Sequence, residues 1–261
     1  MRPGDRARRV AGGERYEVIR EPGRRYRPSA RPRSGRGYAT LHQDRDLLVV
    51  YKRPDLLTVP TPLREGEESL VERLLEAERR RGVRRPALYA LHRLDRDTSG
   101  LLLFARSRRA IAALQEQFED RSIDRRYVAV AEGALPQDRG RLVSRLVESG
   151  RSLKMRSARG RRAGKQAITE YEVIERLPGA SVLAVRILTG RKNQIRVQLA
   201  ESGHPLVGDR RYGRPSALIG RTALHARSIC FVHPADGRRV IFSSPLPGDM
   251  RRLIRSLRRG R

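Results

Sequence analysis

The stretch His92-Arg93-Leu94-Asp95-Arg96-Asp97-Thr98-Ser99-Gly100-Leu101-Leu102-Leu103-Phe104 decides the fold of this chain. A polar turn that contains Asp95 stands between two short apolar runs, residues 88–91 and 101–105. Short apolar runs bounded by turn residues predict buried strands, and Thr98-Ser99-Gly100 supplies the turn chemistry between them. The pattern places a carboxylate at the rim of a sheet, with arginines beside it. An aspartate in such a turn can also serve only its own backbone, through local hydrogen bonds.

Further strands and helices are predicted on both sides of this turn. The apolar runs typical of strands occupy residues 47–51, 127–130, 167–174, 182–188, 226–232 and 240–242. The capping-box pattern Ser69-Leu70-Val71-Glu72 begins a helix that extends through Arg81 and ends at Gly82. Ser107 is placed to cap a second helix, and a short basic helix is expected from about Asp249. This order of elements predicts an α+β fold with a mainly antiparallel, mixed central sheet flanked by helices and loops.

The composition points to a polyanionic partner. The chain of 261 residues has 58 Lys and Arg against 29 Asp and Glu, a formal charge of +29. All but four of the basic residues are arginine. Arginine binds phosphate in a bidentate manner and stacks on bases, so the balance favours RNA. A coding bias toward arginine would change which cation is used, but it would leave the excess over acids unexplained.

The charge is divided among two tails and a globular part. Residues 1–41 carry 12 Arg and four acidic residues, a net +8, and are predicted to be a basic, mostly disordered N-terminal arm. A solvated tail with no role fits that composition equally well. Residues 251–261 carry six Arg and no acid, and form a basic C-terminal tail or helix end. Subtracting +8 and +6 from +29 leaves +15 on residues 42–250, which are the expected catalytic domain.

The sequence argues against several classes of site. Cys230 is the single cysteine, and the five histidines are too far apart in the sequence for a zinc motif, so no metal is expected. Residues 160–166 lack the Ser or Thr of a P-loop, and no Gly-x-Gly-x-x-Gly follows a strand, so no nucleotide cofactor is expected. No signal peptide or membrane span is recognised, which predicts a cytoplasmic protein without a membrane partner. A monomer is the default expectation.

The string His92 to Gly100 resembles the catalytic loop of the RluA-type pseudouridine synthases, and the resemblance extends over about residues 42–250. Seven further segments resemble motifs of that family: Lys52-Arg53-Pro54, Leu57-Thr58-Val59-Pro60, Arg125-Arg126-Tyr127-Val128-Ala129, Gly164-Lys165-Gln166-Ala167-Ile168-Thr169, Thr189-Gly190-Arg191-Lys192-Asn193-Gln194-Ile195-Arg196-Val197, His204-Pro205-Leu206-Val207-Gly208-Asp209 and Leu224-His225-Ala226. The resemblance implies a pseudouridine synthase-like catalytic domain without an S4 domain. The implied reaction breaks the N1–C1′ bond of a uridine, turns the base and rejoins it through C5, without metal, redox or nucleotide cofactor.

The resemblance assigns catalytic roles to three residues. Asp95 is the essential group, and whether it acts as nucleophile or as base stays open. Arg196 is the cation that keeps this carboxylate ionised in a pocket, where burial would otherwise favour its protonated form. Tyr127 packs against the target base, a contact worth roughly 1–3 kcal/mol. Without the resemblance, Arg196 would be interpreted as an arginine that reaches out from a helix or strand, and Tyr127 as a core tyrosine.

Four further residues are expected to contact RNA or to flip the base. Arg93 is placed to fill the gap left by an extruded uridine, which costs a few kcal/mol to unstack. His92 is interpreted as a residue that orients the loop, and Lys165 and Arg191 as RNA-binding residues. The basic segment 150–164 is a loop or hairpin suited to an RNA backbone, although a solvated run of charge explains it equally well.

The sequence departs from the family at one place. Asn193 stands where the family has His, so a supporting hydrogen bond survives but any role that requires imidazole does not. The resulting hypothesis is an RNA pseudouridine synthase that acts without cofactor on a uridine in structured rRNA or tRNA. The alternative is a non-catalytic RNA-binding or ribosome-assembly protein with a synthase-like fold.

Overall fold

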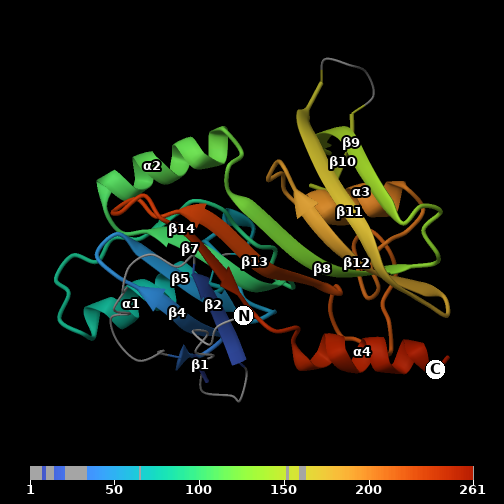
Figure 1. Cartoon of the computed structure of the whole chain (residues 1–261), viewed down its shortest axis with the longest axis horizontal. Coiled ribbons are helices and arrows are strands. Elements are labelled where there is room, and N and C mark those ends of the chain that lie inside the picture. Colours follow the sequence, from blue (N-terminus) through green and yellow to red (C-terminus); the bar gives the residue numbers. More distant parts are fainter. Residues whose placement is uncertain are drawn as a thin grey trace. The chain divides into compact units, whose positions relative to one another are not determined.

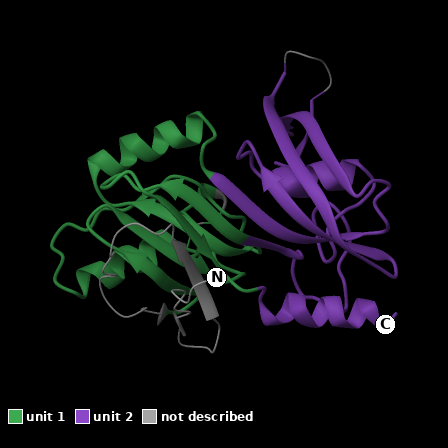
Figure 2. Cartoon of the chain, in the orientation of Figure 1, with its two compact units in different colours: residues 1–123, 227–245 green, residues 124–226, 246–261 purple. Residues whose placement is uncertain are grey.

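The computed structural model describes residues 8–9, 15–20, 34–64, 66–150, 153–158 and 163–260. The chain forms two compact units, residues 1–123 with 227–245 and residues 124–226 with 246–261 (Figure 2). It therefore enters the second unit at residue 124, returns to the first at residue 227 and ends in the second. Both units combine helices with mostly antiparallel strands, as the α+β prediction requires (Figure 1).

In the first unit the strand order is β13-β7-β5-β4-β3. The strands are β1 (Arg8–Arg9), β2 (Arg15–Arg20), β3 (Ser34–Gly35), β4 (Tyr38–Gln43), β5 (Leu47–Lys52), β6 (Tyr89–Ala90), β7 (Ser99–Ala105), β13 (Leu224–Val232) and β14 (Arg239–Ser243). β6 pairs with β7, and β14 lies between β13 and β2. The helices are η1 (Pro62–Arg64, 3-10), α1 (Leu70–Arg79) and α2 (Arg108–Glu119).

The two apolar runs around the Asp95 turn fold as predicted. Every residue of β5 and β7 is buried, because both strands are central in the sheet and apolar on both faces. Their side chains pack against Leu114 of α2 and Phe231 of β13 in one core. The predicted helix caps are confirmed: the Ser69 side chain accepts from the Glu72 N–H while the Glu72 side chain accepts from the Ser69 N–H, and Ser107 caps α2.

In the second unit the strand order is β10-β9-β11-β12-β8. The strands are β8 (Asp124–Glu132), β9 (Arg139–Glu148), β10 (Met155–Ser157), β11 (Lys165–Leu177) and β12 (Ala180–Ile187). The helices are α3 (Gln194–Glu201) and α4 (Gly248–Arg258). Among the described residues, none of these helices combines the length and the apolar composition needed to span a membrane.

The two helices of the second unit cover opposite faces of its sheet. Tyr127 lies opposite Val185, which lies opposite Tyr171, so the three side chains share one face. Ala167, four residues before Tyr171, is on that face too and packs against α3. Val130 is three residues from Tyr127 and points the other way, where it packs against α4. Tyr127 therefore shares its face of the sheet with α3.

Several elements were not predicted from the sequence, among them β2, β4, β9 and α3. β4 begins inside the segment interpreted as the basic arm, as do β1, β2 and β3, and its residues Tyr38, Ala39 and Thr40 pair with β5 and are buried. Residues 1–7, 10–14 and 21–33 of that arm lie outside the described residues. Of the basic segment 150–164, β10 is a strand, whereas residues 151–152 and 159–162 also lie outside them.

Candidate functional site

Asp95 lies in the turn that leads into β7. The Thr98 N–H donates to the Asp95 carbonyl over 3.1 Å and closes the turn. Gly100, the second residue of β7, has a φ of 123°, a backbone conformation that side chains with a Cβ rarely adopt. The Asp95 side chain is half-buried, between buried Leu94 and half-buried Arg96. The turn therefore presents a carboxylate at the edge of a buried sheet, as the sequence predicted.

Two buried side chains anchor the backbone on either side of Asp95. The Thr58 hydroxyl donates to the Leu94 carbonyl over 2.8 Å and accepts from the Leu94 N–H over 3.2 Å. The Lys52 ammonium, with 0% of its surface exposed, donates to the Arg96 carbonyl over 2.8 Å. It also donates to two carbonyls of the segment that follows β5. This arrangement gives a structural role to Lys52 and Thr58, which lie in two segments that resemble family motifs and for which the sequence predicted no role.

His92 is attached to the strand that follows the turn. Its Nε2 accepts from the Leu103 N–H over 3.1 Å, and its ring lies 5.6 Å from that of Phe118, centroid to centroid. Because Nε2 is an acceptor here, the imidazole links the start of the loop to β7 and α2. This geometry agrees with the interpretation of His92 as a loop-orienting residue. Arg93, the next residue, is exposed.

The other two predicted catalytic residues belong to the second unit. Tyr127 is on β8 and Arg196 is on α3, and both side chains are buried. Asp95 belongs to the first unit. The ion pair between Asp95 and Arg196 stays a prediction.

Arg196 forms a buried bidentate ion pair with Asp209. Its Nε donates to Oδ2 of Asp209 over 2.7 Å and its Nη2 to Oδ1 over 2.8 Å. The guanidinium carbon also lies 5.2 Å from the ring centroid of Tyr212, a cation–π contact. The phenol oxygen of Tyr212 in turn accepts from the Met155 N–H over 2.9 Å. Asp209 and Tyr212 thus fix the orientation of the Arg196 guanidinium, and Met155 in turn fixes that of Tyr212.

Asp209 is ionised by its surroundings although it is fully buried. Burial alone would raise the pKa of Asp209, but the hydrogen bonds and charge of Arg196, together with the Arg211 and Tyr212 N–H groups, hold it below the usual value. The preceding Gly208 has a φ of 75°, and a Cβ there would lie 2.4 Å from the Arg221 carbonyl oxygen. The pair Gly208-Asp209 is therefore required by packing and charge. Asp209 lies in one of the motifs that resemble the family, but its pairing with Arg196 was not predicted from the sequence.

Two buried glutamines attach α3 to the sheet on either side of Arg196. Gln194 accepts from the Thr189 hydroxyl over 2.6 Å and donates to the Thr169 hydroxyl over 2.9 Å. Gln198 accepts from the same Thr169 hydroxyl over 2.7 Å and donates to backbone of β9 and β11. Asn193, at the N-cap of α3, has a φ of 54°, which Asn adopts more readily than most residues. The polar face of α3 is thus hydrogen-bonded throughout, and Arg196 stands on a rigid element.

A buried cation, the guanidinium of Arg125, lies close to Tyr127. Arg125, two residues earlier on β8, points to the same face of the sheet and is 8% exposed. Its guanidinium lies against Gly190, where a Cβ would come within 3.0 Å of Nη1. Burial lowers the pKa of Arg125, and the nearby Tyr127 acts in the opposite direction. An Arg and a Tyr side by side in a buried site are suited to a flat, partly anionic ligand.

The predicted RNA-binding residues of the second unit are neighbours. Lys165 is the first residue of β11 and is exposed. Arg191 is also exposed, and its Nε donates to the carbonyl of Gln166, the second residue of that strand, over 3.0 Å. The structure therefore brings Lys165 and Arg191 to the same end of β11.

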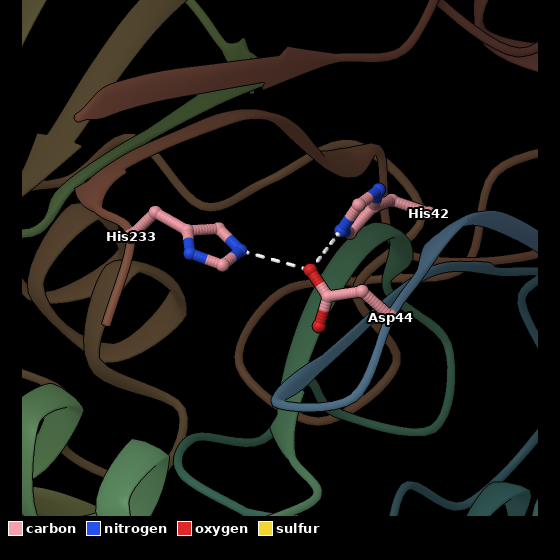
Figure 3. A group of neighbouring side chains, drawn as sticks. All are labelled: His42, Asp44 and His233. Atoms are coloured by element: carbon pink, nitrogen blue, oxygen red, sulfur yellow. Dashed lines mark hydrogen bonds and ion pairs between the residues drawn. The ribbon is translucent and has the colours of Figure 1, made fainter. Parts of the chain in front are cut away.

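A separate cluster joins two histidines that are distant in the sequence. His42 Nε2 and His233 Nε2 each lie 2.9 Å from the same oxygen of Asp44, as Figure 3 shows. The three ligand atoms lie within 4.8 Å of one another, a spacing that a metal ion could occupy. However, His233 Nδ1 accepts from the Ala235 N–H over 3.2 Å, so in the neutral ring the proton is on Nε2 and donates to Asp44. This proton placement favours a hydrogen-bonded clamp over a metal centre.

The clamp connects two turns of the first unit. The second oxygen of Asp44 accepts from the Asp46 and Leu47 N–H groups over 2.7 Å, at the start of β5. His233 lies in the turn between β13 and β14. Burial would raise the pKa of Asp44, but the hydrogen bonds from His233 and His42 hold it well below the usual range. The cluster is therefore a structural feature that sequence spacing could not predict.

Comparison with known proteins gives one consistent result. Residues 46–201 match the family model described as RNA pseudouridylate synthase. Over 229 residues the chain is 36% identical to "Ribosomal large subunit pseudouridine synthase D" of Zymomonas mobilis, covering 82% of this chain and 71% of that protein. It is also 36% identical over 225 residues to "Uncharacterized RNA pseudouridine synthase YhcT" of Bacillus subtilis, covering 83% of this chain and 71% of that protein.

Solved structures agree with the fold. The chain is similar to human RNA pseudouridylate synthase domain containing 4, with a TM-score of 0.69 and 24% identity over 84% of this chain and 92% of that one. It is also similar to human RNA pseudouridylate synthase domain containing 1, with a TM-score of 0.63 and 25% identity over 88% of this chain and 98% of that one.

Proposed function

Because the chain belongs to the RNA pseudouridylate synthase family, we propose that it converts a uridine in structured ribosomal or transfer RNA into pseudouridine by means of Asp95. The protein is an RNA pseudouridine synthase, an isomerase that acts on RNA. The observation that carries the assignment of Asp95 is its place in a turn whose backbone is fixed by Lys52 and Thr58. The alternative of a non-catalytic RNA-binding protein receives no support from the family match.

In the proposed mechanism Asp95 supplies the ionised group that the reaction requires. The glycosidic bond must break and the base must be rejoined through C5, so the site needs a carboxylate that is charged at neutral pH. Asp95 is half-buried at the edge of the sheet, and a cation beside a carboxylate favours its charged form. Whether the carboxylate attacks the sugar or removes a proton from it is a separate question, and both routes begin from the same charged state.

We assign the cation to Arg196. A guanidinium carries five N–H donors in a planar fork, a geometry that can bind more than one carboxylate, and two of these donors bind Asp209. The buried contacts with Asp209 and Tyr212 orient the fork before substrate arrives. In this proposal Arg196 acts on the charge of Asp95 and does not contact the base.

In the proposal, Tyr127 stacks on the flipped base and Arg93 takes the place of the flipped nucleotide in the RNA. Tyr127 lies on the α3 face of β8 next to Arg125, where a uracil could stack on the phenol while detached from its ribose. Arg93 is exposed beside the Asp95 turn and is proposed to enter the space left in the RNA by the extruded uridine. Lys165 and Arg191 contact the RNA backbone at the end of β11.

The RNA is proposed to be ribosomal. A relative from Zymomonas mobilis and another from Neisseria meningitidis carry names that specify the large ribosomal subunit, with 36% identity in both cases. The enzyme is proposed to act in the cytoplasm, as a monomer and without a nucleotide cofactor. Transfer RNA remains the second candidate substrate.

The test is a pseudouridine map of total RNA from cells that lack the gene. Wild type, Asp95→Asn and the matched control Asp97→Asn are each reintroduced, the two variants changing one carboxylate in the same turn. Sites that return with wild type and with Asp97→Asn, but not with Asp95→Asn, identify the substrate and the essential group together. A map that is unchanged by deletion, or equal activity of Asp95→Asn, would overturn the proposal. Binding of RNA by Asp95→Asn is expected to stay within a few-fold of wild type.

A further inference from the structure

The outer side of α4 carries a dense row of arginines. Five of them are exposed: Arg251, Arg252, Arg255, Arg258 and Arg259. At 100° per residue they occupy a stripe about 120° wide, and the step from residue 251 to 255 to 259 is about 6 Å along the axis each time. The helix contains one acidic residue, Asp249, which forms an ion pair with Arg221 at 2.7 Å. The stripe is therefore strongly positive.

Most of this charge is not neutralised within the described part of the chain. Arg258 forms an ion pair with Glu175 at 2.5 Å. The other four arginines form no ion pair with a described carboxylate, and Arg252 acts on Asp249 only at longer range. By contrast, many exposed arginines elsewhere in the chain are paired, among them Arg79, Arg80, Arg139 and Arg214.

Helix stability does not explain the stripe. Cations are favoured in the last turn of a helix and disfavoured in the first, because of the helix dipole. Arg251 and Arg252 lie near the N-terminus of α4, on the disfavoured side. Like charges four residues apart, such as Arg251 and Arg255, repel each other as well. The position of these side chains is therefore better explained by a polyanionic ligand.

The apolar side of the helix is already occupied. Met250, Leu253 and Ile254 are buried against Val130 and Val182 of the sheet. An amphipathic helix that lies on a membrane needs its apolar face for the lipid. α4 cannot offer that face without leaving its own core, so a nucleic acid backbone, which is recognised by charge alone, fits the surface better.

We propose that the arginine stripe of α4 is an accessory docking surface for the sugar–phosphate backbone of the RNA substrate. The inference rests on the proposed function, because it assigns the polyanion to the same RNA. Tyr127 and Arg196 lie on the opposite face of the sheet of the second unit. RNA that reaches α4 must therefore extend beyond the nucleotides around the target uridine. The surface contributes affinity for long structured RNA and takes no part in the chemistry.

The experiment neutralises the stripe without disturbing the helix. A variant with Arg251→Gln, Arg252→Gln, Arg255→Gln and Arg259→Gln keeps the Arg258–Glu175 ion pair and the apolar side, and Gln is as good a helix former as Arg. Binding of a fluorescein-labelled rRNA stem-loop is measured by anisotropy between about 50 and 200 mM salt. We expect the Kd to rise roughly 10–100-fold and the slope of log Kd against log salt to fall by about 3.

A second variant with the same change in net charge is the control. It carries Arg79→Gln, Arg80→Gln, Arg139→Gln and Arg214→Gln, all exposed arginines that already have carboxylate partners. If the two variants lose affinity equally, the effect is one of net charge and the docking surface is refuted. If only the α4 variant loses affinity and the salt slope falls with it, the surface is established. Circular dichroism checks that α4 remains folded in both.

Binding and turnover are measured separately, so the two proposals can fail separately. Anisotropy needs no pseudouridine formation, and it is repeated with the Asp95→Asn background. In single-turnover assays the α4 variant is expected to need more RNA for half-maximal rate but to reach the wild-type rate at saturation. Loss of the maximal rate would contradict an accessory role. If the α4 variant loses RNA binding but the wild type forms no pseudouridine, the proposed function is overturned. The α4 surface would still be an RNA-binding surface.

Discussion

The two units position their site residues in different ways. In the first, hydrogen bonds from the Lys52 and Thr58 side chains hold the main chain on both sides of Asp95. In the second, Arg196 is fixed through its own guanidinium, which is paired with buried Asp209. Hydrogen bonds to the main chain hold a residue in place without engaging its reactive side chain. An ion pair of the side chain, by contrast, uses the same group that is proposed to act in the reaction. The hydrogen bonds of Lys52 and Thr58 to the turn should therefore survive substitution of Asp95, while substitution of Arg196 should cost both activity and stability.

The largest effect is expected for Arg196→Ala. This change leaves the carboxylate of Asp209, which has 0% of its surface exposed, without its partner, a loss of about 3–5 kcal/mol in the free energy of unfolding. Activity should also fall, with the pH–rate profile displaced, because the cation proposed to act on the charge of Asp95 is removed. Urea unfolding and a pH–rate profile are the measurements.

A double variant sharpens this contrast. Arg196→Ala with Asp209→Asn removes the uncompensated charge and keeps an acceptor for the Arg211 and Tyr212 N–H groups. It should recover much of the lost stability without recovering activity. A wild-type pH–rate profile in Arg196→Ala would argue against the proposed action on Asp95, and so would activity restored in the double variant.

The next largest effect tests the backbone anchor. Lys52→Met keeps the volume of the side chain but removes hydrogen bonds to the carbonyls of Arg53, Leu56 and Arg96. We expect a loss of about 2–4 kcal/mol in stability, since three carbonyls, that of Leu56 in a buried bond, lose a charged donor. The maximal rate should fall as the Asp95 turn loosens. Lys192→Met, which changes a lysine at the surface, is the control and should be nearly silent.

A third comparison measures how the stability of each unit depends on the charge of one buried or half-buried carboxylate. The pKa of Asp44 in the first unit and that of Asp209 in the second are both held below the usual value. A depressed pKa contributes stability that is fully present above the unfolded value of about 4 and is lost as the pH falls below it. Asp44→Asn should therefore cost about 2 kcal/mol at pH 7, and the difference from wild type should shrink in acid. A difference that is constant between neutral and acid pH would contradict the charged clamp.

The smallest effect compares two hydroxyl groups. Thr58→Val removes both hydrogen bonds to Leu94, at a cost of about 1–2 kcal/mol. Ser107→Ala removes the cap of α2, at a cost of about 1 kcal/mol. The stability losses are similar, but only Thr58→Val should lower the maximal rate, because only Thr58 touches the turn. Equal rates for the two variants would mean that the turn does not need this anchor.

The sequence predicted the elements that carry a clear apolar pattern. Strands β5 and β7 are continuous apolar runs, and the caps of α1 and α2 have their expected residues. β9 was missed because arginines alternate along its exposed side and no apolar run forms. α3 was missed because it is buried on its polar side as well, with Gln194, Arg196 and Gln198 bonded to the sheet. Its pattern therefore lacks the alternation of faces that marks an amphipathic helix.

The candidate site was predictable to the extent that it is local in sequence. The Asp95 turn is one continuous string, so its residues could be assigned together. The partner of Arg196 lies 13 residues away and is fixed by the fold, since Gly208 and the surrounding backbone bring Asp209 to the guanidinium. His42 and His233 meet only through the strands of the first unit. Contacts of this kind follow from strand order, which sequence spacing does not reveal.

The path of the chain has a consequence for its synthesis. The first unit needs residues 227–245, which a ribosome adds only after the whole of residues 124–226. At about 5–20 residues per second, the segment before residue 124 waits for several seconds with β7 lacking β13, one of its neighbours. An apolar strand without its neighbour is prone to aggregate. A nascent chain stalled before residue 227 should therefore depend on chaperones, and release of β13 and β14 should be the event that ends this dependence.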